Sequence, residues 1–359
     1  MTQMTAFVLR ALRETGVHSS QSFDTRMRIT ARNASTFRRL VAVIAATLMT
    51  CTFGAQNSQP LHSSPGGEYT LELNADIVIL SATVLDHSNA LVSGLGKDDF
   101  QVYEDGMLQR IRYFSHEDIP VTAGILVDNS GSMAPKRADV IAAALAFARS
   151  SNPQDQMFVV NFNDRVSFGL PADVPFTDRK DQLQLALSEI RSIGQTSLYD
   201  GIVAALDHLK QGNRDKKVLI LISDGGDNAS KHSLAQVIDM AKQSAAIIYA
   251  IGIFDEQDGD QNPVVLSRFA KQTGGEAFFP ESSKDIASIC EGIARDIRNQ
   301  YTLTYVPTIA SQDGRYRAIE VKASAPGRGR LSVRTRAGYS VPLTLPAAAA
   351  KAIGHDTRN

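Results

Sequence analysis

Long apolar runs alternate with amphipathic segments through the middle of the chain. After Pro120, the runs VTAGILVD, QMFVVNF, KKVLILISD and AAIIYAIGIF are apolar at almost every position, which is typical of strands covered by helices on both faces. The segments between them, ADVIAAALAFARS, KDQLQLALSEIRS, LYDGIVAALDHLK and SLAQVIDMAKQS, repeat apolar residues at spacings of three and four, as amphipathic helices do. Because strand and helix alternate, residues 121–299 are predicted to form a doubly wound, mostly parallel, Rossmann-like α/β domain, closed by EAFFP and a helix over 285–299.

The pattern on either side of this domain is typical of β structure. The segment EYTLELNADIVILSATVLD alternates apolar and polar residues, and FQVYEDGMLQRIRYF places Asp105 and Gly106 between two alternating runs, which predicts a hairpin. Strand-like sequence returns in YTLTYVP, RYRAIEVKAS and RLSVRTRAGY. Neither arm, 68–118 or 301–341, has enough strands to bury two faces alone. We therefore expect the two arms to pack together as a small flanking β-sandwich-like domain into which the α/β domain is inserted.

The N-terminal region has the order of a secretory leader. Arg38 and Arg39 precede the apolar run LVAVIAATLMTCTF, and the small and polar residues GAQNSQP follow it. The run has about 14 residues, fewer than the roughly 20 that a membrane-spanning helix needs. Residues 1–55 are therefore predicted to be a leader, with the signal peptide around 38–55, and a buried core helix is the alternative. Export to the periplasm, cell envelope or exterior follows, with cleavage between about Cys51 and Ala55 and no membrane span in the mature chain.

The leader raises two further points. A signal peptide is not usually preceded by a segment such as residues 1–26, and Met27, followed by Arg28, would be a more ordinary site for the start of translation. Cys51 is a possible site of lipidation, although Thr50 before it is a poor match to a lipoprotein motif. After the leader, 56–67 is rich in Ser, Pro and Gly and is predicted to be a linker, and the Ala-rich tail 342–359 is predicted to be disordered.

The composition is that of an ordinary globular protein. The chain is 43% apolar and 21% charged with a net charge of −1, so it has no electrostatic field that would attract nucleic acid. Its two cysteines are Cys51 and Cys290, and loss of the first with the leader would exclude an intrachain disulfide. Cys290, in IASICEGIARDI, is interpreted as a buried residue on the apolar face of a helix.

A loop rich in oxygen donors follows the first strand of the α/β domain. In DNSGSM, residues 128–133, the side chains of Asp128, Ser130 and Ser132 lie two residues apart, and Gly131 allows the backbone to turn between them. The carboxyl ends of strands are where open α/β sheets place their ligand sites. Carboxylate and hydroxyl oxygens suit Mg²⁺ or Ca²⁺ better than zinc, which prefers His or Cys. The loop is therefore a candidate metal site, although a helix N-cap on one of the serines is the ordinary alternative.

Two further oxygen donors belong to loops of the same kind. Thr196 lies in GQTSLYDG at the start of a helix, and Asp224 follows the strand KKVLILIS. Because the strands are parallel, all three segments are expected at one edge of the sheet. The predicted metal ligands are Asp128, Ser130, Ser132, Thr196 and Asp224.

This set of residues resembles the metal-ion-dependent adhesion site of von Willebrand factor A domains. The Asp-x-Ser-x-Ser loop, the downstream Thr and the strand-ending Asp occur here in the order of that family. The resemblance implies that hydroxyls and carboxylates hold the ion directly or through water, and that an acidic group of a partner completes its coordination. More narrowly, GLGKDDFQVYEDGMLQRIRYFSHEDIPV and RTRAGY resemble the VWFA-related domain proteins of acidobacteria, whose molecular function is not established.

Other polar residues near these loops are interpreted more simply. Asp227 and Asn228 are expected to be solvated loop residues. Asp200 is either a supporting partner of the metal ligands or an exposed carboxylate in the first turn of a helix. The histidines have no spacing typical of metal ligands.

These features predict a binding protein rather than an enzyme. The chain has no G-x-S-x-G, H-E-x-x-H or Walker motif. The predicted function is that of an exported, metal-dependent protein-binding or adhesion module that uses Mg²⁺, with Ca²⁺ or Mn²⁺ as alternatives, to bind an acidic group of its partner. Two other functions stay open: a metal-assisted hydrolase, and an envelope structural protein whose ion only stabilises the fold.

Overall fold

The computed structural model describes residues 77–188, 192–254, 261–309 and 314–341. The predicted leader, the alternative start at Met27, the lipidation of Cys51, the linker and the C-terminal tail lie outside these residues. Within them, no helix is both long and apolar enough to cross a membrane.

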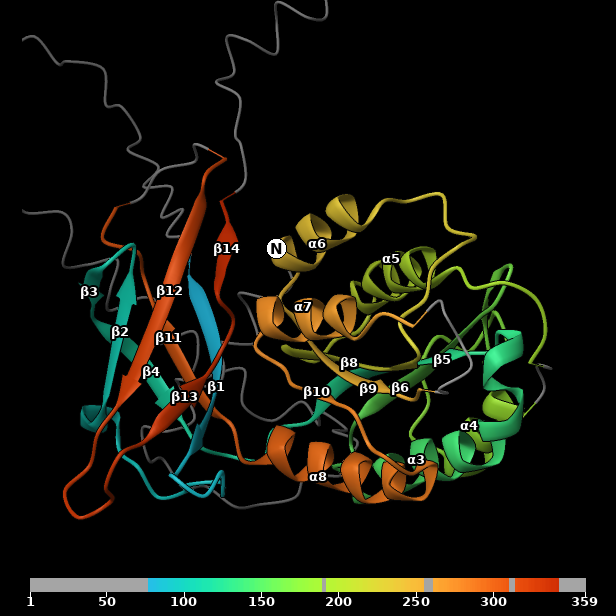
Figure 1. The fold of residues 1–359 in the computed structure, drawn as a ribbon. Coiled ribbons are helices and arrows are strands. Elements are labelled where there is room, and N and C mark those ends of the chain that lie inside the picture. Colours follow the sequence, from blue (N-terminus) through green and yellow to red (C-terminus); the bar gives the residue numbers. More distant parts are fainter. Residues whose placement is uncertain (1–76, 189–191, 255–260, 310–313, 342–359) are drawn as a thin grey trace, which may run out of the picture. The chain divides into compact units, whose positions relative to one another are not determined.

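A six-stranded sheet forms the centre of the α/β domain (Figure 1). Its strand order is β10-β9-β8-β5-β6-β7. Five of the strands are parallel to their neighbours: β5 (Val121–Asp128), β6 (Gln156–Phe162), β8 (Lys216–Ser223), β9 (Ala246–Gly252) and β10 (Ala277–Phe278). The short strand β7 (Val166–Phe168) is antiparallel at one edge. Every residue of β5 is buried, as expected for a strand covered on both faces.

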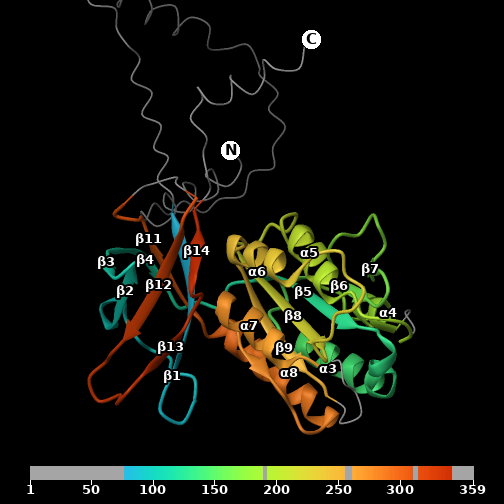
Figure 2. The same cartoon turned by 45° about the horizontal axis from the view of Figure 1, so that its top comes forward.

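Helices cover both faces of this sheet, which confirms the doubly wound architecture (Figures 1 and 2). One face carries α5 (Leu198–Leu209), α6 (Leu234–Gln243) and α7 (Pro263–Thr273). The other carries α3 (Arg137–Ser150), α4 (Lys180–Ser188) and α8 (Ile286–Arg298). Short 3₁₀ turns precede some elements: η1 (Lys97–Asp99), η2 (Gly131–Lys136) and η3 (Ser283–Asp285). As predicted, Cys290 is buried in α8, and burial raises the pKa of its thiol to about 12.

Gly124 lies in the middle of β5, where the sheet is packed on both faces. A Cβ atom here would lie 2.5 Å from Phe158 Cζ and 2.7 Å from Leu219 Cδ2, both in buried side chains. We therefore expect Gly124→Ala to lower the free energy of unfolding by about 1–3 kcal/mol through overpacking, as measured by urea denaturation. The control is Gly292→Ala in α8, where the added Cβ would lie 3.9 Å from Arg295 Nη2 and should be neutral or stabilising. A Gly124→Ala protein as stable as the wild type would contradict the packing argument.

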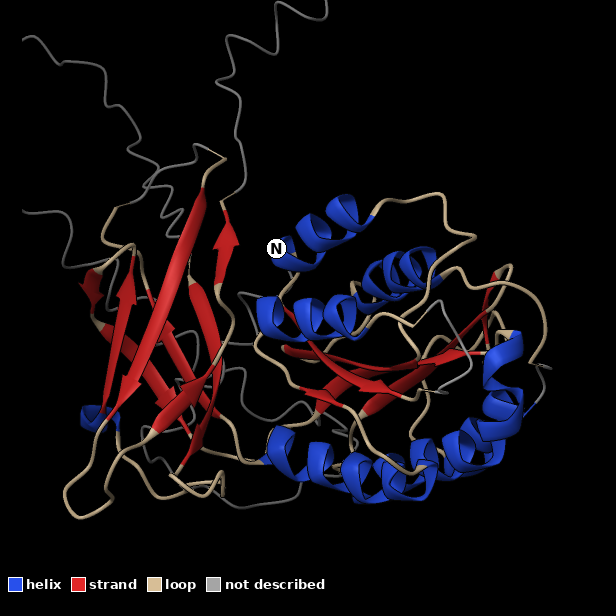
Figure 3. Cartoon of the chain, viewed as in Figure 1, coloured by secondary structure: helices blue, strands red, loops and turns tan. Residues whose placement is uncertain are grey.

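The N- and C-terminal strands form a β-sandwich, as predicted (Figure 3). One sheet has the order β13-β1-β11-β4 and the other β14-β12-β2-β3. Strands from the two arms pair directly, with Val78 opposite Tyr305 and Val102 opposite Val321. The strands are β1 (Val78–Leu85), β2 (Phe100–Glu104), β3 (Met107–Gln109), β4 (Ile111–Ser115), β11 (Tyr301–Tyr305), β12 (Tyr316–Ala323), β13 (Ser332–Arg334) and β14 (Gly338–Ser340).

The hairpin at Asp105 and Gly106 is confirmed, but the run that follows it is not a single strand. Both turn residues have positive φ, 48° and 80°, as a two-residue hairpin turn of this kind requires. After the turn, β3 pairs with β2, whereas β4 lies in the other sheet beside β11. The run RLSVRTRAGY divides in the same way, since β13 pairs with β1 and β14 with β12. Each run therefore passes from one sheet of the sandwich to the other.

Candidate metal centre

The two candidate carboxylates lie at the carboxyl ends of neighbouring strands. Strands β5 and β8 are paired in parallel, with Val127 opposite Ile222. Asp128 ends β5, and Asp224 directly follows β8. Both side chains are nearly inaccessible, at 2% and 3% exposed. The register of the sheet therefore brings two acidic side chains to the same edge, as the sequence predicts.

Ser130 and Ser132 connect the two carboxylates. Ser132 Oγ donates to Asp224 Oδ2 at 2.6 Å, and Ser130 Oγ lies 3.1 Å from Ser132 Oγ. The backbone N–H of Ser130 donates to Asp128 Oδ1 at 2.9 Å, while Ser223 Oγ donates to Asp128 Oδ2 at 2.6 Å. Four of the five predicted ligands thus form one hydrogen-bonded cluster.

The N-cap alternative for the serines is not what the structure has. Ser130 occupies the N-cap position of η2, but its side chain accepts no capping hydrogen bond. The hydroxyl lies instead beside Ser132 Oγ. Both serine hydroxyls are therefore part of the carboxylate cluster.

Thr196 is joined to the cluster through the backbone of its loop. The N–H of Gly131 donates to Gly194 O at 3.1 Å, which ties this loop to the Asp128 loop. Thr196 O accepts from the N–H groups of Asn228 and Ala229, both at 3.0 Å, which ties it to the Asp224 loop. Thr196 itself is 6% exposed. The three loops of the predicted site therefore form one hydrogen-bonded unit, and the contacts that position Thr196 are made by its backbone.

The pair of carboxylates has an unfavourable electrostatic environment. Burial and, after it, the nearby charge of Asp224 together raise the pKa of Asp128 to about 6, although hydrogen bonds from Ser130 and Ser223 oppose the shift. Among the described residues, no lysine, arginine or histidine forms an ion pair with Asp128 or Asp224. A small cation would neutralise both groups, so this donor set fits a hard divalent ion.

The donor set also differs from that of a zinc site. Nowhere in the described part of the chain do three His, Cys, Asp or Glu side chains gather closely enough to hold a metal. The candidate centre has two carboxylates, and its remaining donors are hydroxyl oxygens. Such a set suits Mg²⁺, Ca²⁺ or Mn²⁺.

The sequence suggests that Asp227 and Asn228 are solvated loop residues, but both side chains accept hydrogen bonds from backbone N–H groups. Asp227 is half-buried and accepts from Tyr199 N at 3.1 Å and from Ser230 Oγ at 2.5 Å. Asn228 is exposed, yet its Oδ1 accepts from Thr196 N at 2.9 Å. Their residue types offered a signal, because Asp, Asn and Ser side chains often bond to backbone N–H groups in turns.

Ser223 is a contributor that sequence reasoning missed. It is fully buried, its Oγ donates to Asp128, and it accepts from Gly225 N at 3.0 Å. As the last residue of an apolar strand, it could have been recognised as a buried hydroxyl that needs partners at the site edge.

Residues 124–291 match the family model described as the von Willebrand factor type A domain. This match spans most of the α/β domain, which is called the A domain below. Among solved structures, a von Willebrand factor type A protein from Catenulispora acidiphila is 12% identical with a TM-score of 0.46, and the alignment covers 77% of each chain. An aerotolerance-related membrane protein from Bacteroides fragilis is 15% identical with a TM-score of 0.40, covering 49% of this chain and 98% of that one.

Another similar structure is that of proximal thread matrix protein 1 from the mussel byssus. It is 16% identical with a TM-score of 0.42, and the alignment covers 50% of this chain and 48% of that one. That structure is described as having zinc in its metal-ion-dependent adhesion site motif. A search of curated proteins gave no match to this chain.

Proposed function

We propose that this chain is an exported, metal-dependent protein-binding module whose A domain, residues 121–299, holds a divalent cation. The proposed ligands are Asp128, Ser130, Ser132, Thr196 and Asp224. The observation that supports this most strongly is the pair of buried carboxylates, which Ser130 and Ser132 link to each other and which form no ion pair with a basic side chain of the described residues. Folding such a pair is costly unless a cation occupies the site.

The chemistry of the donors indicates the kind of partner. A divalent ion held by two carboxylates and neutral hydroxyls keeps a positive character and an affinity for one more anionic oxygen. An Asp or Glu side chain of another protein is the simplest group to supply that oxygen. The chain's own residues would then orient the ion and exclude water around it, because Asp128, Ser130 and Asp224 are nearly inaccessible.

Location and family are parts of the same proposal. The leader predicted over residues 38–55 supports export to the periplasm, envelope or exterior. The segments GLGKDDFQVYEDGMLQRIRYFSHEDIPV and RTRAGY support membership of the VWFA-related domain proteins. Activity as a metal-assisted hydrolase is the second candidate, and would require turnover that depends on the same ion.

Metal titration tests the proposal directly. Isothermal calorimetry of Mg²⁺ into the metal-free wild type should give one site per chain, and Asp224→Asn should abolish it because a charged ligand is lost. Ser130→Ala should weaken binding less, because water can replace a neutral hydroxyl. Asp207→Asn, on an exposed carboxylate of α5, should bind as the wild type does.

The outcomes are distinct. Absence of a Mg²⁺, Ca²⁺ or Mn²⁺ heat with the wild type, or equal affinity in wild type and Asp224→Asn, would show that the site is misplaced. Capture of an envelope protein that is lost both in EDTA and with Asp224→Asn, but kept with Asp207→Asn, would link the ion to partner binding.

A further inference from the structure

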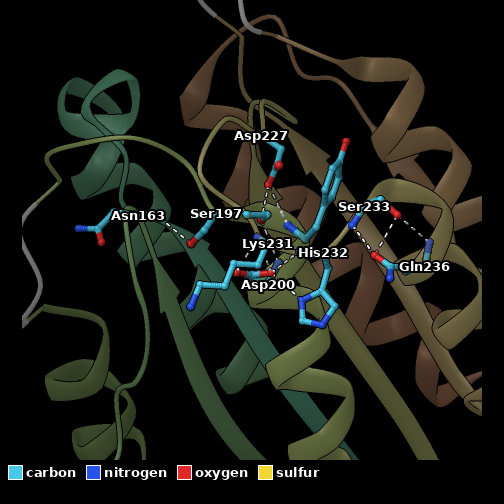
Figure 4. Close-up of polar contacts among 10 residues, drawn as sticks. Asn163, Ser197, Asp200, Asp227, Lys231, His232, Ser233 and Gln236 are labelled. Atoms are coloured by element: carbon cyan, nitrogen blue, oxygen red, sulfur yellow. Dashed lines mark hydrogen bonds and ion pairs between the residues drawn. The ribbon is translucent and has the colours of Figure 1, made fainter.

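The start of α5 and the loop that follows Asp224 hold each other by reciprocal hydrogen bonds (Figure 4). From the loop, Asp227 Oδ1 accepts from Tyr199 N at 3.1 Å and Ser230 Oγ accepts from Asp200 N at 3.0 Å. These are N–H groups of the first helical turn, which have no partner within the helix. The loop therefore supplies acceptors that cap α5.

In the other direction, the carboxylate of Asp200 in α5 accepts hydrogen bonds from the loop. It accepts from Lys231 N at 3.1 Å and from His232 N at 3.0 Å, and it lies 2.7 Å from His232 Nδ1. The side chain is only 20% exposed, whereas that of His232 is 42% exposed. Figure 4 shows Asp200 beside Lys231 and His232, with Asp227 above them. One carboxylate thus gathers three donors from a loop that has no regular structure of its own.

The opposite side of the same helix start is fixed to the strand edge. Ser197 N and Ser197 Oγ both donate to Asn163 O, at 2.8 and 2.6 Å. Asn163 directly follows β6. The first turn of α5 is therefore a fixed point to which the loop after Asp224 is attached.

We propose that Asp200 is a positioning residue of the metal centre. It clamps the loop of residues 224–233 to α5, and so keeps Thr196 and Asp224 in their relative positions. This inference rests on the proposed function, because it assumes that Thr196 and Asp224 are both ligands. Asp200 touches neither of them. It acts through Lys231 and His232, which lie seven and eight residues beyond Asp224 on the same loop.

The loop needs such a clamp because its own backbone is permissive. Asp224 is followed by two glycines, of which Gly225 has a φ of 83°. Glycines lower the cost of alternative backbone conformations, so an untethered loop would populate many of them. Without Asp200, the ion would have to order this loop as it binds, and its affinity would fall accordingly.

A simpler role for Asp200 is the ordinary favourable interaction of an acidic residue with a helix N-terminus. That role would stabilise α5 but leave the affinity for the ion unchanged. It would also treat asparagine and alanine alike, since both lack the charge. A clamp distinguishes them, because the amide oxygen of asparagine can still accept from Lys231 N or His232 N.

The test is calorimetric titration of Mg²⁺ into the metal-free full chain and its variants. We expect Asp200→Ala to weaken Mg²⁺ binding about 10–100-fold, the range for residues that orient metal ligands, and Asp200→Asn to recover most of it. Ser230→Ala removes a bond of the same clamp from the loop side and should give an intermediate loss. Asp207→Ala, on the same helix and paired with Lys210, should leave the affinity unchanged.

The two proposals fail in different ways. A wild type that binds no divalent ion overturns the metal centre and this inference together. A wild type that binds Mg²⁺ while Asp200→Ala binds it equally well overturns the clamp alone. Equal losses in Asp200→Ala and Asp200→Asn also overturn it, because they indicate a charge effect. If Asp200→Ala does not fold, Asp200→Asn and Ser230→Ala still decide the question by their affinities relative to Asp207→Ala.

Discussion

Arg334→Ala is expected to lower the free energy of unfolding by about 3–5 kcal/mol, because it removes the cation that is bonded to a buried carboxylate. The Arg334 guanidinium bonds to Glu276 through Nη1 and to Asp296 through Nη2. The Asp296 side chain is only 9% exposed. It also accepts from the hydroxyl of Tyr249 at 2.7 Å and from Thr83 Oγ1 at 2.6 Å. These two neutral donors cannot replace the charge that Arg334 provides.

The position of this network increases the effect. Thr83 in β1 and Arg334 in β13 belong to the β-sandwich, whereas Tyr249 in β9 and Asp296 in α8 belong to the A domain. Gln300 Nε2, between the two, donates to Thr83 Oγ1 and to the Tyr249 hydroxyl, both at 3.1 Å. Loss of Arg334 should therefore weaken the coupling of both domains and broaden or split the urea transition.

Two further variants make the result interpretable. Asp296→Asn added to Arg334→Ala removes the unpaired charge and should recover part of the lost stability. Arg179→Ala breaks an ion pair of 2.6 Å with Asp181 in which both side chains are more than 60% exposed, and should cost at most about 1 kcal/mol. Equal small losses for Arg334→Ala and Arg179→Ala would show that the buried pair contributes nothing net.

The sequence predicted the elements whose residues interact locally. The parallel strands could be recognised because β5 is buried at all of its positions, so its sequence is continuously apolar. The hairpin turn could be recognised because Asp105 and Gly106 tolerate positive φ. Helix α7 was missed although its start has a readable pattern. Asn262 caps Val265 N, and Pro263 occupies the first turn.

The candidate site was predictable to a similar degree. Asp128 and Asp224 could be placed at one edge because each comes at the end of a strand and neighbouring strands are parallel. For Asp200, the sequence left open a supporting partner of the metal ligands and an exposed carboxylate, and the contacts of its side chain with Lys231 and His232 could not be predicted. These contacts join the first turn of α5 to a loop about 30 positions away, and the conformation of that loop has no periodic pattern. The division of the strand runs across the sandwich was hidden for the same reason.

In the metal-free protein, Asp128→Asn is expected to raise the free energy of unfolding by about 2–3 kcal/mol at pH 7.5, while abolishing Mg²⁺ binding. The pKa of Asp128 is raised from 3.8 to about 6 by burial and by the charge of Asp224. Asparagine has the same shape without the charge. Its oxygen can still accept from Ser130 N, and its amide can donate to Ser223 Oγ.

The sign of the pH dependence follows from the raised pKa. The folded protein holds the Asp128 proton more tightly than the unfolded chain does, so the metal-free wild type loses stability as pH rises from about 4 to about 6. Above about 6 the loss is complete and constant. Asp128→Asn lacks this contribution, so the difference between variant and wild type should be absent near pH 4 and full above pH 6.

Asp155→Asn is the matched control, because burial also raises the pKa of Asp155 to about 6. Asp155 accepts from Val121 N at 2.7 Å, at the amino end of β5 and therefore at the opposite edge of the sheet from Asp128. Both variants should differ from the wild type with the same pH dependence in EDTA. Only Asp128→Asn should lose the stabilisation by Mg²⁺, which for the wild type is about 2.7 kcal/mol at a Mg²⁺ concentration of a hundred times the dissociation constant.

Urea denaturation at pH 4.5 and 7.5, in EDTA and in excess Mg²⁺, measures the free energy of unfolding of each variant under each condition. An Asp128→Asn protein that is less stable than the wild type in EDTA at pH 7.5 would mean that the fold needs the charged carboxylate without any ion, and that the cluster is structural.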